Sequence, residues 1–219
     1  MTAIVFDLDG TLVDTAPDIN AVANIVLTAE GLAPIDLEAT HAFIGKGVRA
    51  FLEQALAAQA TRRDDAALAR MVEEFERHYR TAASRSRLYP HVAQVLRRLR
   101  DDGHRLGVCT NKPIEPARFV LDQFALAPFF EVVVGGDSLP VKKPDPAPLL
   151  DAFARLCAGA EDRLYVGDSE VDARTAARAG IPFALFTEGY RTTPADALEH
   201  EIAFDRYTAI PDFVRRRFA

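Results

Sequence analysis

MTAIVFDLDGTLVDT, residues 1–15, decides the fold class of this chain. Its apolar residues 3–6 have the pattern of a buried strand, and they run directly into Asp7, Asp9 and a Gly-Thr pair. Carboxylates at the mouth of an apolar core are costly to bury and repel each other. An isolated Asp-x-Asp could be a solvated turn at a strand end, or it could hold a positively charged group. The residues that follow the other strands decide between these two interpretations.

Strand-like apolar runs recur along the chain and alternate with helical patterns over its second part. The expected strands are residues 3–6, 105–109, 131–134, 163–166 and 182–186. Apolar residues at helical spacing lie between the later strands, for example over residues 92–99. Strands that alternate with helices are typical of a parallel sheet with helices on both faces. The sequence therefore predicts an α/β fold, a doubly wound parallel sheet of the Rossmann-like type.

One interval breaks this alternation. Between Asp14 and Leu88 the sequence shows no convincing strand, and its helical patterns cover residues 19–26, 48–56 and 68–79. A connection of roughly 70 residues far exceeds the ~2–6 residues that usually join a strand to its helix. We therefore expect an inserted all-helical cap, residues 15–85, on a core formed by residues 1–14 and 86–219. Its hinges should lie near Thr15 and Ser86.

Polar residues gather where the expected strands end. In an open parallel α/β sheet, ligands bind beyond the carboxyl ends of the strands. The residues placed there are Asp7 and Asp9, then Thr110, Asn111 and Lys112, then Lys142 and Lys143, and finally Asp168 and Asp172. Because these groups should converge on one rim, they favour a binding site over unrelated solvated turns.

The converging groups suit phosphoryl transfer. Asp7, Asp168 and Asp172 offer an oxygen-rich site, and Mg²⁺ fits it best because this ion takes few carboxylates and keeps water and phosphate oxygens as its other ligands. Extended spacing puts Asp7 and Asp9 on one side of the chain, so one can attack while the other handles a proton. The hydroxyl and amide donors after the second strand and a lysine at the rim would neutralise phosphoryl oxygens.

Composition argues against several other classes of protein. The chain has 219 residues and a net charge of −6, whereas nucleic-acid binders grip phosphates with an excess of Lys and Arg. Its two cysteines and five histidines show no metal-ligand spacing. Asp7 interrupts any leader pattern, and no uncharged apolar run approaches the ~18 residues of a membrane span. We expect a cytoplasmic monomer or homodimer with no nucleic-acid or membrane partner.

The polar motifs, taken in order, resemble those of the haloacid dehalogenase superfamily. The matching residues are Asp7-Leu8-Asp9-Gly10-Thr11, Thr110-Asn111, Lys143-Pro144 and Gly167-Asp168-Ser169 with Asp172. The resemblance covers the whole chain, including a helical cap inserted after the first motif, and Asp9 favours a phosphatase over a dehalogenating member. It implies Mg²⁺-dependent hydrolysis of a phosphomonoester through an aspartyl phosphate.

The resemblance also implies a role for each acidic residue. Asp7 would be the nucleophile, and Asp9 would protonate the leaving oxygen and later deprotonate the attacking water. Asp7, the backbone carbonyl of Asp9 and Asp168 would ligate Mg²⁺. Asp172 would either ligate the metal directly or orient metal-bound water or Lys143, and the sequence leaves these alternatives open.

The basic and neutral residues of the motifs receive roles in the same way. Thr110 and the amide of Asn111 would hold phosphoryl oxygens. Lys143 would neutralise the nucleophile and the phosphate, because the motif places Lys directly before Pro. Lys142 would then be a solvated neighbour.

Three further stretches resemble the phosphatases of this superfamily that hydrolyse 2-phosphoglycolate: residues 14–18, 44–49 and 187–190. In the second stretch, the cap residues that could contact a small phosphorylated substrate are Gly45, Lys46, Gly47 and Arg49, although a plain helix–helix turn is an equal alternative. The expected substrate is 2-phosphoglycolate. Other reactions stay open, namely hydrolysis of a sugar phosphate or pyrophosphate and a phosphoglucomutase-type phosphotransfer, and so does a phospho-accepting signalling module without turnover.

Overall fold

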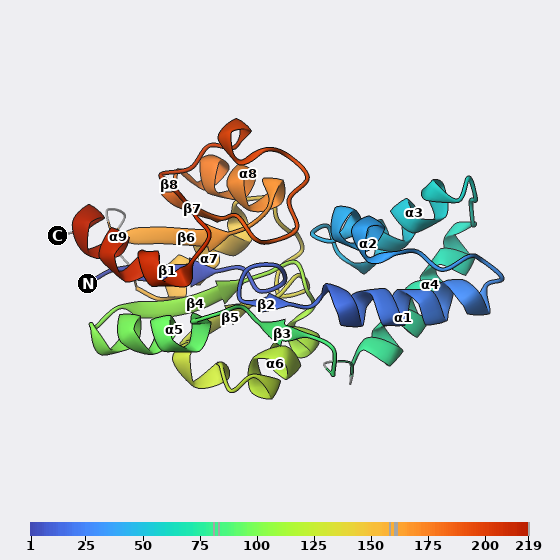
Figure 1. Cartoon of the computed structure of the whole chain (residues 1–219), viewed down its shortest axis with the longest axis horizontal. Helices are drawn as coiled ribbons and strands as arrows, with labels where there is room; N and C mark the ends of the chain where they lie inside the picture. Colours follow the sequence, from blue (N-terminus) through green and yellow to red (C-terminus); the bar gives the residue numbers. More distant parts are fainter. Residues whose placement is uncertain (81, 83, 158, 160–161, 219) are drawn as a thin grey trace.

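Parallel strands form a six-stranded sheet in the computed structural model, which describes residues 1–219 except 81, 83, 158, 160, 161 and 219 (Figure 1). Their spatial order is β5-β4-β1-β6-β7-β8. The strands are β1 (Ala3–Phe6), β4 (Arg105–Cys109), β5 (Val132–Val134), β6 (Arg163–Gly167), β7 (Phe183–Phe186) and β8 (Ile202–Phe204). Phe6 pairs with Val108 on one side and Val166 on the other, so the three central strands end at nearly the same level. The side chains that follow them therefore meet at one edge.

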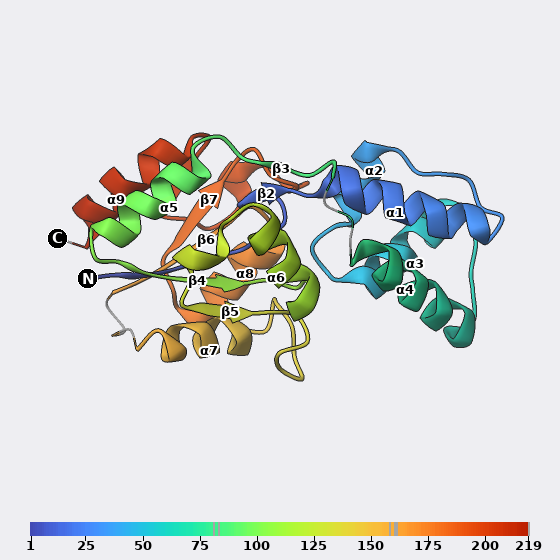
Figure 2. The same cartoon turned by 90° about the horizontal axis from the view of Figure 1, so that it is seen from below.

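Helices cover both faces of this sheet (Figure 2). One face carries α5 (Val92–Asp101), α6 (Ile114–Gln123) and α9 (Ile210–Arg217), and the other carries α7 (Ala147–Arg155) and α8 (Glu170–Ala179). Along β1, Ile4 and Phe6 belong to the first core and Val5 to the second, as the two-residue period of a strand requires. Burial on both faces explains the continuous apolar run. The predicted doubly wound parallel sheet is confirmed.

Four helices form a separate unit beyond the carboxyl ends of the central strands (Figure 1). They are α1 (Ala16–Ala29), α2 (Leu37–Phe43), α3 (Val48–Ala58) and α4 (Asp65–Tyr79). The unit has its own core, in which Leu27, Leu52 and Met71 are almost completely buried. The helical patterns at residues 19–26, 48–56 and 68–79 correspond to α1, α3 and α4. The domain boundaries at residues 14/15 and 85/86 stay a prediction.

The two connections between this helical unit and the sheet lie side by side. The short strand β2 (Val13–Asp14) pairs antiparallel with β3 (Arg87–Leu88). Asp18, in the first turn of α1, is buried and accepts hydrogen bonds of 2.5–3.2 Å from the backbone N–H groups of Arg85 and Ser86 and from the Ser86 hydroxyl. Asp18 thus ties together the two segments in which the sequence predicts hinges.

The sequence patterns did not predict α2 or β8. In α2 only Thr40 is buried, so the helix has no apolar stripe, although the side chain of Asp36 caps its N-terminus by accepting a hydrogen bond from the N–H of Ala39. The edge strand β8 has three residues, of which only Phe204 is buried. Among the described residues, no helix combines the length and the apolar character needed to cross a membrane.

Candidate functional site

A cleft with about 790 Å³ of empty space separates the carboxyl ends of the central strands from the helical unit. On the sheet side it is lined by Asp7, Asp9, Thr110, Asn111, Lys112, Pro113, Pro116, Asp168, Ser169 and Tyr190. On the helical side it is lined by Ile19, Ile44, Gly45, Gly47, Val48, Phe51, Phe75, Glu76 and Tyr79. The lining therefore contains marked residues that follow β1, β4 and β6, and it does not include Lys142, Lys143 and Asp172.

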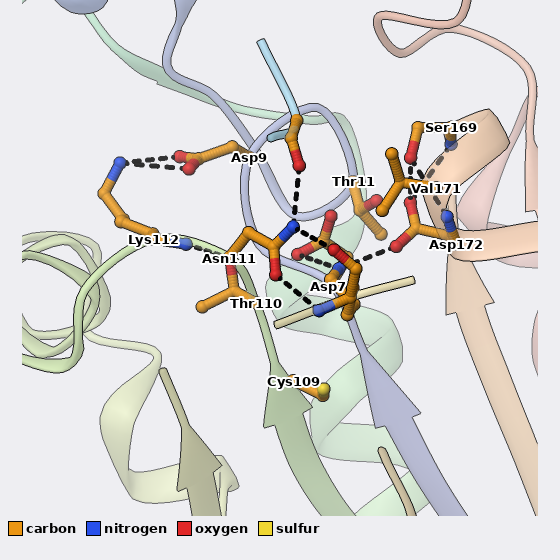
Figure 3. A network of polar contacts seen from close by, with 12 residues as sticks. Asp7, Asp9, Thr11, Cys109, Thr110, Asn111, Lys112, Ser169, Val171 and Asp172 are labelled. Atoms are coloured by element: carbon orange, nitrogen blue, oxygen red, sulfur yellow. Dashed lines mark hydrogen bonds and ion pairs between the residues drawn. The ribbon is translucent and has the colours of Figure 1, made fainter. Parts of the chain in front are cut away.

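Asp7 and Asp9 leave the end of β1 in different surroundings (Figure 3). The carboxylate of Asp7 is buried, and its Oδ1 lies 3.0 Å from the Lys143 ammonium. Burial raises the pKa of Asp7 to about 7, against the opposing effect of Lys143. Asp9 accepts a hydrogen bond of 2.7 Å from the hydroxyl of Thr15 and contacts the ammonium of Lys112. The two acids thus face different cations.

Asp168, directly after β6, is held by two donors from distant parts of the chain. Its carboxylate accepts hydrogen bonds from the hydroxyl of Thr11 at 2.6 Å and from the backbone N–H of Tyr190 at 2.7 Å. Gly10 makes this approach possible, because its φ is +81° and a Cβ there would lie 2.5 Å from an Asp168 oxygen. Gly10, next to Asp9, therefore leaves the room that the Asp168 carboxylate needs.

Asp172 and Lys143 form a fully buried pair behind the cleft. The Lys143 ammonium donates to Asp172 Oδ1 at 2.7 Å and to the hydroxyl of Tyr165 at 2.8 Å. The other carboxylate oxygen of Asp172 accepts from the N–H and the hydroxyl of Ser169, in the capping box of α8. Although burial alone would lower it, the carboxylates of Asp172 and Asp7 raise the pKa of Lys143 above its ordinary value. The lysine is therefore a fixed positive charge beside Asp7.

Asp7, Asp168 and Asp172 also meet each other, with one carboxylate oxygen of each within 4.8 Å of the others. Burial raises the pKa of Asp168 well above its usual range, and the charges of Asp172 and Asp7 add to this effect. A bound divalent cation would relieve such an accumulation of buried negative charge, and hard oxygen donors suit Mg²⁺. The residues present therefore fit the metal that the family resemblance implies.

Mg²⁺ should stabilise the folded protein through Asp168. An ion that binds only the folded state adds about 2.7 kcal/mol to the free energy of unfolding at one hundred times its Kd. We expect calorimetry to show a higher melting temperature with Mg²⁺ than with a chelator for the unchanged protein, and little difference for Asp168→Asn. Asp205→Asn, which alters an exposed carboxylate outside the acidic group, should respond like the unchanged protein. Equal metal-induced shifts in all three proteins would contradict a metal role for Asp168.

Thr110 and Asn111 follow β4 at the floor of the cleft. Both are buried, and the hydroxyl of Thr110 accepts a hydrogen bond from the backbone N–H of Lys112. The side-chain amide of Asn111 donates to the carbonyls of Gly45 and Lys143 and accepts from the N–H of Lys143 at 2.9 Å. The Asn111 side chain is therefore already occupied in holding two loops, one from the core and one from the helical unit.

The four cap residues singled out in the sequence do not stay together. Gly45 and Gly47 line the cleft. The side chain of Lys46 is exposed and is not part of the lining. Arg49 forms ion pairs with Glu53 at 3.1 Å and Asp65 at 2.6 Å. The structure thus brings the two glycines to the site and leaves both basic side chains outside it.

Sequence reasoning gave no separate role to two residues that the structure places at the site. Lys112 was seen after the second strand, but nothing in its spacing distinguished it from a solvated lysine. Tyr190 lies in the stretch 187–190, which the family resemblance marked without indicating why. Its hydroxyl accepts hydrogen bonds from the N–H groups of Thr15 and Ala16 and donates to Asp14 at 2.7 Å.

Comparison with known proteins shows the family to which the chain belongs. The family model described as haloacid dehalogenase-like hydrolase matches residues 4–186. A phosphoglycolate phosphatase of Cereibacter sphaeroides is 46% identical over 220 residues, with all of both chains covered. One from Rhodobacter capsulatus is 43% identical, covering 97% of this chain and 96% of the relative.

A solved structure gives the same result at the level of the fold. The crystal structure of a predicted phosphoglycolate phosphatase from Haemophilus somnus superimposes with a TM-score of 0.91 at 29% identity. The match covers 97% of each chain. These findings confirm the resemblance that the sequence motifs indicated. The chain belongs to the haloacid dehalogenase-like hydrolases.

Proposed function

We propose that this hydrolase cleaves phosphomonoesters with the help of Mg²⁺, through an aspartyl phosphate on Asp7, and that its substrate is 2-phosphoglycolate. The observation that carries the proposal is the setting of Asp7, a buried carboxylate at the cleft floor with the Lys143 ammonium at 3.0 Å and Asp168 beside it. Relatives named phosphoglycolate phosphatase, similar over their full length, support the choice of substrate.

The first chemical step forms the aspartyl phosphate. A carboxylate oxygen of Asp7 attacks phosphorus while the bond from phosphorus to the ester oxygen breaks, and Asp9 gives its proton to that oxygen. Lys143, the Thr110 hydroxyl and the backbone N–H of Asn111 offset the charge on the phosphoryl oxygens. We assign this last role to the backbone N–H because the Asn111 side chain is occupied.

The second step releases phosphate. Asp9, now ionised, takes a proton from a water molecule as that water attacks phosphorus, and the bond to Asp7 breaks. When bound by Asp7, Asp168 and the backbone carbonyl of Asp9, Mg²⁺ would supply positive charge that offsets the negative charge on the phosphoryl oxygens. Asp172 acts by positioning Lys143, because its two oxygens are taken up by hydrogen bonds from Lys143, Tyr165 and Ser169.

The direct test measures phosphate release from 2-phosphoglycolate beside sugar phosphates, nucleotides and pyrophosphate, each with Mg²⁺ and with a chelator. The proposal expects Mg²⁺-dependent release and the highest kcat/KM for 2-phosphoglycolate. A higher kcat/KM for another ester would keep the mechanism and overturn the substrate. Lack of release from every ester would overturn hydrolysis, and a long-lived phosphorylated Asp7 found by mass spectrometry would then indicate a phosphotransferase or a phospho-accepting module.

A further inference from the structure

We propose that Lys112 recognises the carboxylate of the substrate by exchanging Asp9 for it, so that acidic substrates release Asp9 for catalysis. The inference rests on the proposed function, because it requires a phosphorylated acid in the cleft. It gives a physical basis for a substrate preference that the cap residues Lys46 and Arg49, neither of which lines the cleft, do not explain.

The starting point is the ion pair between Lys112 and Asp9 (Figure 3). The Lys112 ammonium lies 2.8 Å and 3.1 Å from the two carboxylate oxygens of Asp9. It also donates to the hydroxyl of Tyr79 in α4 at 2.7 Å and lies 4.3 Å from the centre of that ring. Its side chain is 4% exposed. Lys112 is therefore a fixed, desolvated cation that already binds one carboxylate.

The cleft lining offers a substrate carboxylate one positively charged partner. Among the described residues that line the cleft, Lys112 carries the one cationic side chain. Lys143 is engaged by Asp7, Asp172 and Tyr165. Glu76 lies on the helical side and would repel an anion there. Within the cleft lining, a small acid with its phosphoryl group at Asp7 thus has Lys112 as its remaining counter-charge.

The same contact restrains the proposed proton donor. Asp9 has to reach the ester oxygen of the bound substrate, but both of its oxygens contact Lys112. A substrate carboxylate offers the same two acceptor oxygens and can replace Asp9 at the ammonium. Asp9 then keeps its hydrogen bond from Thr15 and is free to turn. A neutral ester cannot make this exchange and leaves Asp9 paired, which should appear as a difference in kcat.

The test compares 2-phosphoglycolate with ethyl phosphate, in which a methyl group replaces the carboxylate. We expect the unchanged protein to prefer the acid. Lys112→Met should lower kcat/KM for 2-phosphoglycolate on the order of 10- to 100-fold, the usual effect of losing a hydrogen-bonded charge, and should change kcat/KM for ethyl phosphate much less. Lys112→Arg, which keeps the positive charge, should retain the preference, and so should Arg97→Met, which removes an exposed positive charge from α5, outside the cleft.

The outcomes that overturn the inference differ from those that overturn the function. If Lys112→Met lost kcat/KM equally for both esters, Lys112 would have a general structural role. If its preference for the acid were undiminished, another group would bind the carboxylate. Equal kcat/KM for the two esters in the unchanged protein would also overturn the inference while leaving phosphatase activity intact. Failure of the unchanged protein to hydrolyse either ester would overturn the proposed function itself.

Discussion

Replacing Asp7 by asparagine should reduce phosphate release by about 10⁴-fold or more, because an amide oxygen cannot form the aspartyl phosphate that we propose. The measurement is steady-state phosphate release with Mg²⁺, combined with mass spectrometry of the protein after mixing with substrate. The unchanged protein should show a transient gain of one phosphoryl group on Asp7, and the variant should show none.

Stability provides the control for this substitution. Burial raises the pKa of Asp7 to about 7, which means that the folded protein disfavours the ionised carboxylate. Below about pH 4 the carboxyl is protonated in both states, and as pH rises through 7 the folded state loses stability relative to a neutral side chain. In the absence of metal, Asp7→Asn should therefore be at least as stable as the unchanged protein above neutral pH. Substantial phosphate release from a well-folded Asp7→Asn protein would contradict the nucleophile assignment.

Replacing Lys143 by methionine should lower the free energy of unfolding by about 3–5 kcal/mol, since removing one partner of a buried ion pair leaves an uncompensated charge. The ammonium lies 2.7 Å from Asp172, whose side chain is fully buried, and 3.0 Å from Asp7. Denaturant unfolding measures the loss. Lys142→Met, on the exposed neighbour, should change the free energy of unfolding by no more than about 0.5 kcal/mol.

A double substitution distinguishes charge from packing at this position. If the loss in Lys143→Met comes from the stranded carboxylate, adding Asp172→Asn should recover part of the stability, because both partners of the pair are then neutral. Phosphate release should stay low in the double variant, since the positive charge beside Asp7 is missing. If the double variant loses as much free energy of unfolding as the two single variants do together, packing rather than the ion pair accounts for the effect.

The sheet and the acidic part of the site could be predicted because one physical rule connects them. Parallel strands buried on both faces appear as continuous apolar runs, and their carboxyl ends share one edge. Asp7 and Asp168 follow two such runs directly, so a strand assignment correct to about one residue already places both carboxylates together. The helical unit could be predicted for a similar reason, since α1, α3 and α4 each carry an apolar stripe.

The remaining features depend on directions that a linear pattern does not contain. The sequence named Arg49 as a candidate substrate contact and gave Lys112 no role. In the structure, however, Lys112 lines the cleft, and Arg49 pairs with Glu53 and Asp65. Asp172 could have been a metal ligand or a positioning residue. Its hydrogen bonds with Ser169, Lys143 and Tyr165 favour the second role.

The adjacent connections at Asp18 have a consequence for how such a protein can evolve. Because β2 and β3 pair and Asp18 bridges the chain on both sides of the insertion, the ends of the four-helix segment lie as close together as those of a hairpin. Closing a long loop whose ends are already fixed costs the sheet little entropy, whatever the loop contains. A different helical segment could therefore be exchanged between these two strands without refolding the sheet. The helical side of the cleft can then change while the sheet keeps Lys112 and the catalytic carboxylates in place.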